Sequence, residues 1–380
     1  MTWQKKMLFS NSSKTSIFFY MNIPYLSLQA VTNQHAEEIQ QAVKRVVDSG
    51  WYLLGEEVKA FEKEFANYTE SEHCIGCANG LDALTMILRG YIALGRLTEG
   101  DEVLVPANTY IASILAISEC RLKPVLLEPK LSTFLLDDNE IERHITSKTK
   151  AIMLVHLYGY NAYTEKIGML CREKSLLLIE DCAQAHGNVP PHKDIEGACA
   201  YSFYPGKNLG ALGDGGCITT HNEYLAHTVR SLCNYGSSEK YVFDHQGRNS
   251  RLDEIQAAVL RVKLRYLDRD NNRRRQIADR YISEIKNSSL TLPPRDGVFH
   301  IFPMLCSNRE KTQDYLSEKG IGTMIHYPIP PHKQKAYTEW NSLSLPITEK
   351  IHREELSLPC NQTMTDDEVT YVIESLNAMK

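Results

Sequence analysis

The sequence lacks an excess of charge of either sign. Among its 380 residues, 42 Lys and Arg stand against 47 Asp and Glu, which gives a net charge of −5. Nucleic acids and anionic membranes are usually bound by strongly basic surfaces, so the composition argues against both as partners. No apolar run reaches the roughly 18 residues that a membrane-spanning helix needs. A small anionic ligand held by a local site remains compatible with this composition.

The sequence also lacks the cysteine pattern of a disulfide framework or a zinc site. Its ten cysteines are scattered, and a chain of this length can build a core without disulfides, so we expect a reducing, cytoplasmic setting. Cys74 and Cys77 form a C-x-x-C pair. Zinc would need a second pair and a redox pair would suit a smaller unit, so we interpret both as small residues packed at a strand end. No histidine spacing indicates a metal site, and we expect none.

The first residues do not share the pattern of the rest of the chain. Lys5 and Lys6 precede apolar residues, as in a signal peptide, but the polar stretch 11–15 interrupts them and no small-x-small cleavage site follows. We therefore expect residues 1–21 to be a flexible leader.

Short apolar runs alternate with helix-length segments through the first two thirds of the chain. The runs lie at 102–106, 123–128, 151–159, 176–181, 200–204 and 216–220. This alternation is typical of a mostly parallel sheet covered by helices on both faces. Beyond residue 222 the pattern predicts long helices over 252–286, a linker over 287–300 and a smaller α+β unit over 301–380. The last helix of that unit is expected to begin after Thr365.

Lys207 lies in a glycine-rich stretch, SFYPGKNLGALGDGG (202–216), directly after an apolar run. Glycines let the backbone approach a ligand closely. An amine in a partly desolvated pocket can have a pKa low enough for it to attack a carbonyl group. The alternative is a surface lysine in a glycine-rich loop.

Two further features lie where a ligand could bind. Asp181 ends the run 176–181, and ligands of parallel sheets bind at the carboxyl ends of strands, where a carboxylate can face a cationic ring nitrogen. The alternative is a helix N-cap. The turn 78–80 begins a helix whose free N–H groups suit a phosphate, although many helices begin this way. A lysine, a carboxylate and a phosphate site together are what pyridoxal phosphate requires.

These motifs resemble those of a known family, the sugar-nucleotide aminotransferases of the DegT/DnrJ/EryC1/StrS group. The resemblance runs from about Asn22 to the C-terminus, through PANTYIAS (106–113), VHLYG (155–159), IEDCAQAHG (179–187), SFYPGKNLGALGDGG (202–216), NYGSSEKY (234–241) and NSRLDEIQAA (249–258). It implies the type I fold of pyridoxal phosphate-dependent aminotransferases, an α/β fold whose mostly parallel seven-stranded sheet is sandwiched by helices. Residues 22–270 would form the large cofactor-binding domain and residues 271–380 a smaller C-terminal α+β domain.

The resemblance also assigns roles around the cofactor ring. Lys207 would bond to pyridoxal phosphate and later shuttle the proton, and Asp181 would keep the pyridine nitrogen protonated. Gln184, one helical turn after Asp181, would hydrogen-bond the ring hydroxyl. Tyr110 would stack on the ring face; the alternative is an ordinary core aromatic.

The remaining roles concern the phosphate and the sugar. The Gly80 and Leu81 amides and the Ser202 hydroxyl would hold the phosphate. Asn234 would reach the phosphate of a neighbouring subunit, which implies a homodimer with shared active sites. Tyr204, His326 and Tyr327 match positions near the sugar, although His326 could instead be an ordinary loop residue.

The implied reaction is the transfer of an amino group from L-glutamate to a dTDP-ketosugar. The YPGKN and NYGS motifs and residues 87–103 are most similar to enzymes that aminate C3 of a dTDP-3-keto-6-deoxyhexose. The galacto form would give dTDP-3-amino-3,6-dideoxy-alpha-D-galactose for an O-antigen (lipopolysaccharide) or S-layer glycan. The alternatives are C3 amination of the gluco epimer and C4 amination of dTDP-4-keto-6-deoxyhexose. Some relatives that lack the lysine are dehydratases, and a regulatory binder is also conceivable, but the presence of Lys207 favours transamination.

Overall fold

A seven-stranded sheet forms the centre of the larger part of the molecule. The computed structural model describes residues 21–188 and 192–379, so the predicted leader lies, except for Met21, outside the described residues. The strands are β1 (His73–Cys77), β2 (Glu102–Pro106), β3 (Lys123–Leu127), β4 (Thr149–Val155), β5 (Leu177–Asp181), β6 (Gly197–Ser202) and β7 (Gly216–Thr220), in the spatial order β1-β7-β6-β5-β4-β2-β3. Strands β2 to β6 pair in parallel, and only β7 runs antiparallel to its neighbours β1 and β6. The predicted mostly parallel sheet is confirmed.

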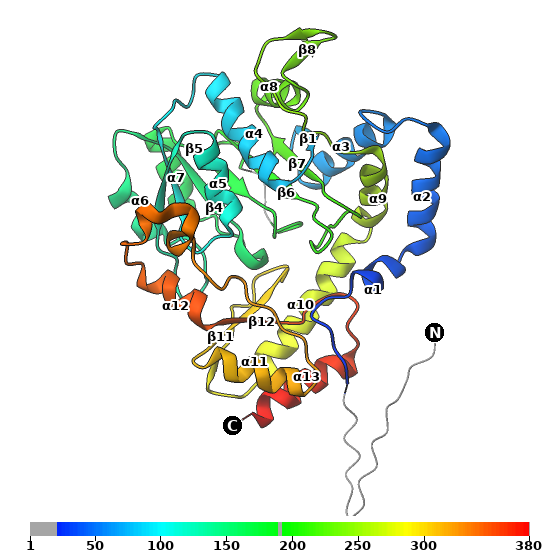
Figure 1. Ribbon diagram of the computed structural model, residues 1–380, viewed down its shortest axis with the longest axis vertical. Coiled ribbons are helices and arrows are strands. Elements are labelled where there is room, and N and C mark those ends of the chain that lie inside the picture. The colour runs from blue at the N-terminus through cyan, green and yellow to red at the C-terminus, as the bar shows by residue number, and fades with distance from the viewer. Residues whose placement is uncertain (1–20, 189–191, 380) are drawn as a thin grey trace, which may run out of the picture.

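Helices cover both faces of this sheet. Successive strand residues point to opposite sides, so strands made of apolar residues present an apolar surface on each face. The helices α4 (Gly80–Ala93), α5 (Ile111–Glu119) and α8 (Glu223–Cys233) pack on the face that carries Leu177 and Ile179. The opposite face, which carries Leu178, packs against α6 (Asp138–His144) and α7 (Glu165–Lys174), and nearer β1 against α3 (Glu56–Tyr68) and α9 (Glu254–Leu264). Figure 1 shows these layers around the sheet. Helix α2 (Ala36–Ser49) lies outside α9, and α1 (Leu28–Asn33) lies below α2 in this view.

A smaller unit follows α10 (Leu267–Glu284) at the lower end of Figure 1. Its antiparallel sheet is formed by β10 (Leu290–Thr291), β11 (Phe302–Cys306) and β12 (Glu355–Leu358), with the helices α11 (Arg309–Glu318), α12 (Pro346–Glu354) and α13 (Asp366–Ala378). The side chain of Thr365 caps α13 in a capping box with Glu368, as the sequence predicts. A two-stranded hairpin, β8 (Ser237–Glu239) and β9 (Val242–Phe243), projects beyond α8.

The domain division at residue 270 stays a prediction, and two observations bear on it. The proposed boundary falls inside α10, which is continuous from 267 to 284. Ile23, at the start of the described chain, forms a bridge with Ile321 and lies in the core of the smaller unit. The N-terminal segment therefore packs with the C-terminal unit rather than with the large sheet.

Two local expectations are corrected. The run 151–159 is not one strand, because β4 ends at Val155 and residues 157–159 form a 3-10 turn in which Tyr158 has a positive φ of 62°. Cys77 ends β1 as expected, but Cys74 lies within the strand, and the two side chains pack into the cores on opposite faces of the sheet. No helix in the described part of the chain is long and apolar enough to cross a membrane.

Candidate active site

The carboxyl ends of β5 and β6 bring two predicted site residues to one edge of the sheet. The strands are parallel neighbours in which Asp181 pairs with Ala200, so Ser202 lies two residues further along the adjacent strand. This edge faces the smaller unit, whose loop 326–327 contacts the residues that follow β5. The site therefore lies between the sheet edge and the smaller unit.

Asp181 is held as a buried hydrogen-bond acceptor. Its side chain is 7% exposed, and its carboxylate accepts hydrogen bonds from the Ser113 hydroxyl at 2.7 Å and from the Ala183 amide at 3.1 Å. Residues 182–188 form turns rather than a helix. The N-cap interpretation of Asp181 is therefore wrong, and Gln184 lies on a turn and not one helical turn further on.

Lys207 lies on the turn that follows β6. The strand ends at Ser202, so the lysine is not directly after it as expected, and its backbone N–H donates to the Tyr204 carbonyl at 2.8 Å. The side chain is partly buried. Burial lowers the pKa of its amine to about 8, although attraction by the nearby Asp181 carboxylate raises it. An amine in this environment does not fit the alternative of an ordinary surface lysine.

The loop that carries Lys207 is fixed by residues that sequence reasoning missed. The buried Asn208 amide donates to Asn271 Oδ1 at 2.8 Å and to the Val298 carbonyl at 3.2 Å. Lys263 Nζ donates to the Gly210 carbonyl. Asn208 belongs to the glycine-rich motif, but Lys263 lies on α9, and no local pattern connects it with this loop.

Gly210 is required by a close backbone approach. A Cβ atom at this position would lie 2.4 Å from the Pro205 carbonyl oxygen, which is too close for any side chain. At Gly206, in the same loop, the nearest atom to a Cβ would be 3.5 Å away, an ordinary contact. Position 210 therefore has no space for a side chain and position 206 has, a difference that the sequence motif does not reveal.

The start of α4 abuts Ser202. Asn79 caps the helix by accepting the Asp82 amide at 2.9 Å, which leaves the amides of Gly80 and Leu81 without helical partners. A Cβ at Gly80 would lie 2.6 Å from the Ser202 Cβ, so only glycine allows this approach. Two amides and a hydroxyl thus gather at a helix N-terminus, an arrangement that suits an anion.

The smaller unit contributes Tyr327 to the same edge, where it contacts Gln184 and Tyr110. Gln184 Nε2 donates to the Tyr327 hydroxyl at 3.0 Å, and Gln184 Oε1 accepts the Tyr158 amide at 2.6 Å. The Tyr110 and Tyr327 ring centroids are 5.0 Å apart. Tyr110 is 52% exposed, so the alternative of an ordinary core aromatic is wrong.

Three imidazoles around the lysine are kept neutral. Burial first, and the positive charge of Lys207 second, lower the pKa of His186 to about 3 and of His326 to about 4. The same two causes hold the pKa of His300 well below its usual range. Both ring nitrogens of the fully buried His186 are without a hydrogen-bond partner among the described residues.

The side chains of two predicted residues, Asn234 and Tyr204, form no hydrogen bond with the other site residues within the described chain. Asn234 ends α8, and its side-chain oxygen accepts a hydrogen bond from Arg251 at 3.2 Å. Tyr204 is 58% exposed.

Ser113 belongs to the cluster although no role was predicted for it. The PANTYIAS motif contained it, but only its hydrogen bond to Asp181 reveals what it does.

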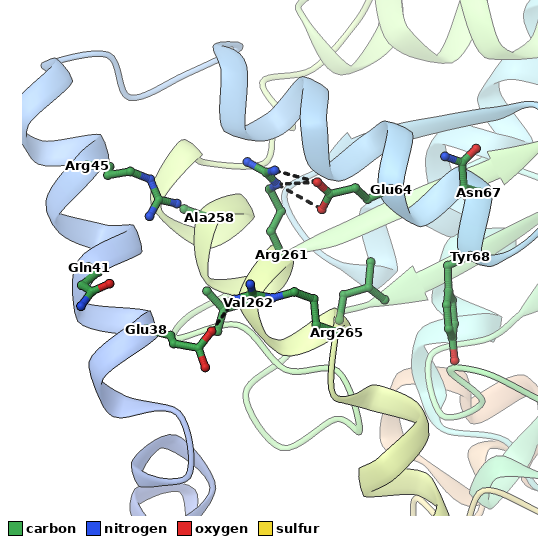
Figure 2. A pocket seen from close by; sticks show the side chains of 11 residues that line it. Glu38, Gln41, Arg45, Glu64, Asn67, Tyr68, Ala258, Arg261, Val262 and Arg265 are labelled. Carbon is green, nitrogen blue, oxygen red and sulfur yellow. Dashed lines mark hydrogen bonds and ion pairs between the residues drawn. The ribbon is translucent and has the colours of Figure 1, made fainter.

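A separate groove lies between α2, α3 and α9, away from Lys207. Figure 2 shows the side chains that line it, which include both charged and apolar residues, and its volume is about 740 Å³. Arg261 pairs with Glu64, and Arg265 pairs with Glu38, each at 2.6 Å, so its charges are largely neutralised internally. Across residues 21–188 and 192–379, no group of three or more His, Cys, Asp or Glu side chains could hold a metal ion.

Comparisons with known proteins agree with this geometry. A model described as the DegT/DnrJ/EryC1/StrS aminotransferase family matches residues 33–377. The chain is 53% identical over 363 residues to the dTDP-3-amino-3,6-dideoxy-alpha-D-galactopyranose transaminase of Aneurinibacillus thermoaerophilus, covering 93% of this chain and 99% of that relative.

Two crystal structures confirm the predicted aminotransferase fold. DesV of S. venezuelae, in complex with a ketimine intermediate, superposes with a TM-score of 0.89 and 41% identity, covering 94% of this chain and 98% of that one. NtdA of Bacillus subtilis, with bound cofactor PMP, gives a TM-score of 0.85 and 32% identity, covering 93% of this chain and 84% of that one.

The lowered pKa of Lys207 predicts that its amine reacts at a lower pH than an ordinary lysine. In cofactor-free protein, an amine-acylating reagent should modify Lys207 with a pH midpoint near 8, because burial lowers the pKa of this amine from 10.5 to about 8. Asp181→Asn should move the midpoint to lower pH, because it removes an attraction that stabilises the ammonium form. Peptide mapping by mass spectrometry gives the midpoint. The exposed Asp194→Asn is the control, and a wild-type midpoint above pH 10 would contradict the assignment.

The two loop glycines predict opposite outcomes for the same substitution. Gly210→Ala should displace the loop and remove the selective modification of Lys207 at pH 8, because its Cβ meets a backbone carbonyl. Gly206→Ala should retain the selectivity, since its Cβ makes only ordinary contacts. Both variants are compared with the wild type by the same peptide mapping, after circular dichroism has shown that they fold. Equal behaviour of the two variants would refute this account of the loop.

Proposed function

Because this chain belongs to the DegT/DnrJ/EryC1/StrS aminotransferase family, we propose that it transfers the amino group of L-glutamate to C3 of a dTDP-3-keto-6-deoxyhexose, with pyridoxal phosphate as cofactor. The observation that carries the proposal is the 53% identity to the Aneurinibacillus enzyme, over nearly the whole of both chains. We therefore take the galacto form as the substrate and dTDP-3-amino-3,6-dideoxy-alpha-D-galactose as the product.

The residues at the sheet edge fit pyridoxal phosphate. Its aldehyde calls for an amine of lowered pKa, which Lys207 supplies, and its ring nitrogen calls for a buried carboxylate, which Asp181 supplies. Its phosphate suits the free amides of Gly80 and Leu81 beside the Ser202 hydroxyl. The bound PMP of NtdA, a relative at 32% identity, supports the same assignment.

The protein would orient this group from several sides. Ser113 holds the Asp181 carboxylate by a hydrogen bond, so the carboxylate keeps one direction toward a ring nitrogen. Gln184 has a second amide hydrogen available for the ring hydroxyl besides the one that it donates to Tyr327. Tyr110, exposed at the start of α5, is placed to cover the ring face.

The chemistry needs a proton carrier next to the reacting carbon. Bound pyridoxal phosphate supplies an electron sink for the carbon from which a proton is removed. Lys207 Nζ can accept that proton and return it, because a pKa of about 8 leaves a useful neutral fraction near neutral pH. His186, His300 and His326 add no positive charge around the amine, since their pKa values are depressed. Tyr204, His326 and Tyr327 are the proposed contacts of the sugar.

Exposed apolar side chains support a homodimer with shared sites. Tyr241 and Phe243 on the β8–β9 hairpin are 81% and 58% exposed, and residues 51–54 (WYLL) form a second exposed apolar segment. Asn234 lies immediately before the hairpin. A hairpin inserted into a second copy would bury this surface and carry Asn234 toward the partner's phosphate site.

Two further assignments stay predictions. The product would serve an O-antigen (lipopolysaccharide) or S-layer glycan, as the resemblance implies. A cytoplasmic location agrees with ten cysteines that are all free thiols.

Product analysis tests the proposed reaction. The protein is incubated with glutamate and, separately, the 3-keto galacto sugar, its gluco epimer and the 4-keto sugar, each as the dTDP derivative. We expect nitrogen at C3 of the galacto product by NMR, and no product from Lys207→Ala. Preference for the gluco epimer would overturn the sugar assignment, and nitrogen at C4 would overturn the C3 assignment.

Subunit complementation tests the shared sites. Lys207→Ala and an Asn234→Asp variant are co-expressed with different tags, and the doubly tagged species is isolated. If Asn234 serves the partner's site, this heterodimer contains one intact site and should recover about half of wild-type activity, although each variant alone is impaired. A doubly tagged dimer without recovered activity would show that Asn234 serves its own site.

A further inference from the structure

The backbone of His326 and Tyr327 is clamped by three buried side chains. The His326 N–H donates to the Glu355 carboxyl at 2.6 Å, and the His326 carbonyl accepts the Tyr158 hydroxyl. The Tyr327 carbonyl accepts a hydrogen bond from His352 Nδ1 at 2.8 Å. The position of this dipeptide is therefore fixed without a ligand. These backbone contacts do not determine which nitrogen of the His326 ring carries the hydrogen.

The inner nitrogen of that ring belongs to a buried hydrogen-bond chain. His326 Nδ1 lies 2.8 Å from Ser357 Oγ, and Ser357 Oγ is hydrogen-bonded to Glu355 Oε1. Glu355 and Ser357 are both 0% exposed and lie two residues apart, on one face of β12. The antiparallel bridge between Met324 and Ser357 places His326 alongside Glu355.

The outer nitrogen, Nε2, has no hydrogen-bond partner within the described residues and lies on the other side of the ring. The charge of Lys207 contributes to the lowered pKa of His326, so the imidazole lies within electrostatic reach of the reactive amine. With its pKa lowered to about 4, the ring is neutral at physiological pH and carries a single hydrogen, on one nitrogen or the other.

A serine hydroxyl has one hydrogen, so it can donate in only one direction along this chain. If Glu355 is ionised, Ser357 donates to it, Nδ1 donates to Ser357, and Nε2 is an acceptor. If Glu355 is protonated, it donates to Ser357, Ser357 donates to Nδ1, and Nε2 carries the hydrogen. Between the two states the Glu355 proton passes to Ser357, the Ser357 proton passes to Nδ1, and the Nε2 proton leaves to solvent.

We propose that Glu355 and Ser357 are positioning residues that set the tautomer of His326, so that a proton on Glu355 corresponds to a hydrogen-bond donor at Nε2. The inference rests on the proposed function only for the ligand atom that Nε2 meets. A donating Nε2 would suit an oxygen acceptor of the ketosugar, such as its keto oxygen.

The surroundings of Glu355 favour the donor state at neutral pH. Burial raises the pKa of Glu355 to about 8, against the opposing effects of the Ser357 and His326 hydrogen bonds and of the Arg309 charge. Other titratable groups whose charges interact with Glu355 are Tyr25, Tyr158, Cys306 and Tyr327, and those that interact with His326 are Lys207 and His300. Among these groups, Lys207 has the pKa nearest to that of Glu355, since both pKa values are about 8.

Nitrogen NMR of the His326 ring tests the proposal on the purified holoenzyme without substrate. Histidines are labelled with ¹⁵N, and the His326 signal is assigned by its loss in His326→Gln. In the wild type we expect hydrogen on Nε2 at pH 6.5, with a change to Nδ1 as the pH rises through about 8. Glu355→Gln should hold hydrogen on Nε2 at every pH. The His326 N–H requires the amide oxygen as its acceptor, so the amide NH₂ faces Ser357 and can only donate to it. Ser357→Ala should abolish the pH response.

Glu354→Gln is the matched control, because Glu354 is next in the chain but pairs with Lys350 on α12. It should reproduce the wild-type response. A His326 tautomer that does not change between pH 6.5 and 9.5, or that changes equally in wild type and Glu355→Gln, would overturn the proposal. If Ser357→Ala fails to fold, the comparison of wild type with Glu355→Gln still decides. Since no substrate is present, failure of the proposed reaction would leave this outcome unaffected.

Discussion

The candidate site depends on one electrostatic constraint, which is that an amine must keep a lowered pKa beside a buried carboxylate. Burial of Lys207 lowers the pKa of its amine, whereas the Asp181 carboxylate opposes that shift. The nearby His186 and His326 imidazoles stay neutral and so add no charge of their own, and Ser113 donates a hydrogen bond to the Asp181 carboxylate. The parallel pairing of β5 with β6 makes this juxtaposition possible, because it puts the ends of both strands at one edge of the sheet.

The smaller unit completes the site. Its loop at His326 and Tyr327 contacts Gln184, which lies on the turn after β5. The buried contacts that hold this loop, from Glu355, Tyr158 and His352, are polar rather than apolar. Such contacts fix direction as well as distance, so the loop keeps one orientation at the edge of the site.

The sequence was sufficient for the architecture, and its local motifs contain the candidate residues that the structure brings together at the sheet edge. Alternating apolar runs predict the parallel strands, and the Thr365 cap predicts the start of the last helix, because both signals are local in the chain. Lys263 and the pair Glu355 and Ser357 could not be found in this way. Each acts on a residue that is distant in sequence, and their positions become visible only when α9 and β12 are placed against the site loops. The strand end at Ser202 and the turn around Gln184 were also beyond local patterns, because hydrogen bonding between strands decides them.

The continuous helix α10 has a mechanical consequence. Asn271, near its start, donates to the His186 carbonyl and accepts from the Asn208 amide beside Lys207. One turn later, Arg274 donates to the Cys360 carbonyl and to Gln362 of the smaller unit. The same continuous helix is thus hydrogen-bonded to the loop beside Lys207 and to the smaller unit. A displacement of the smaller unit would therefore be transmitted through α10 to the loop beside Lys207.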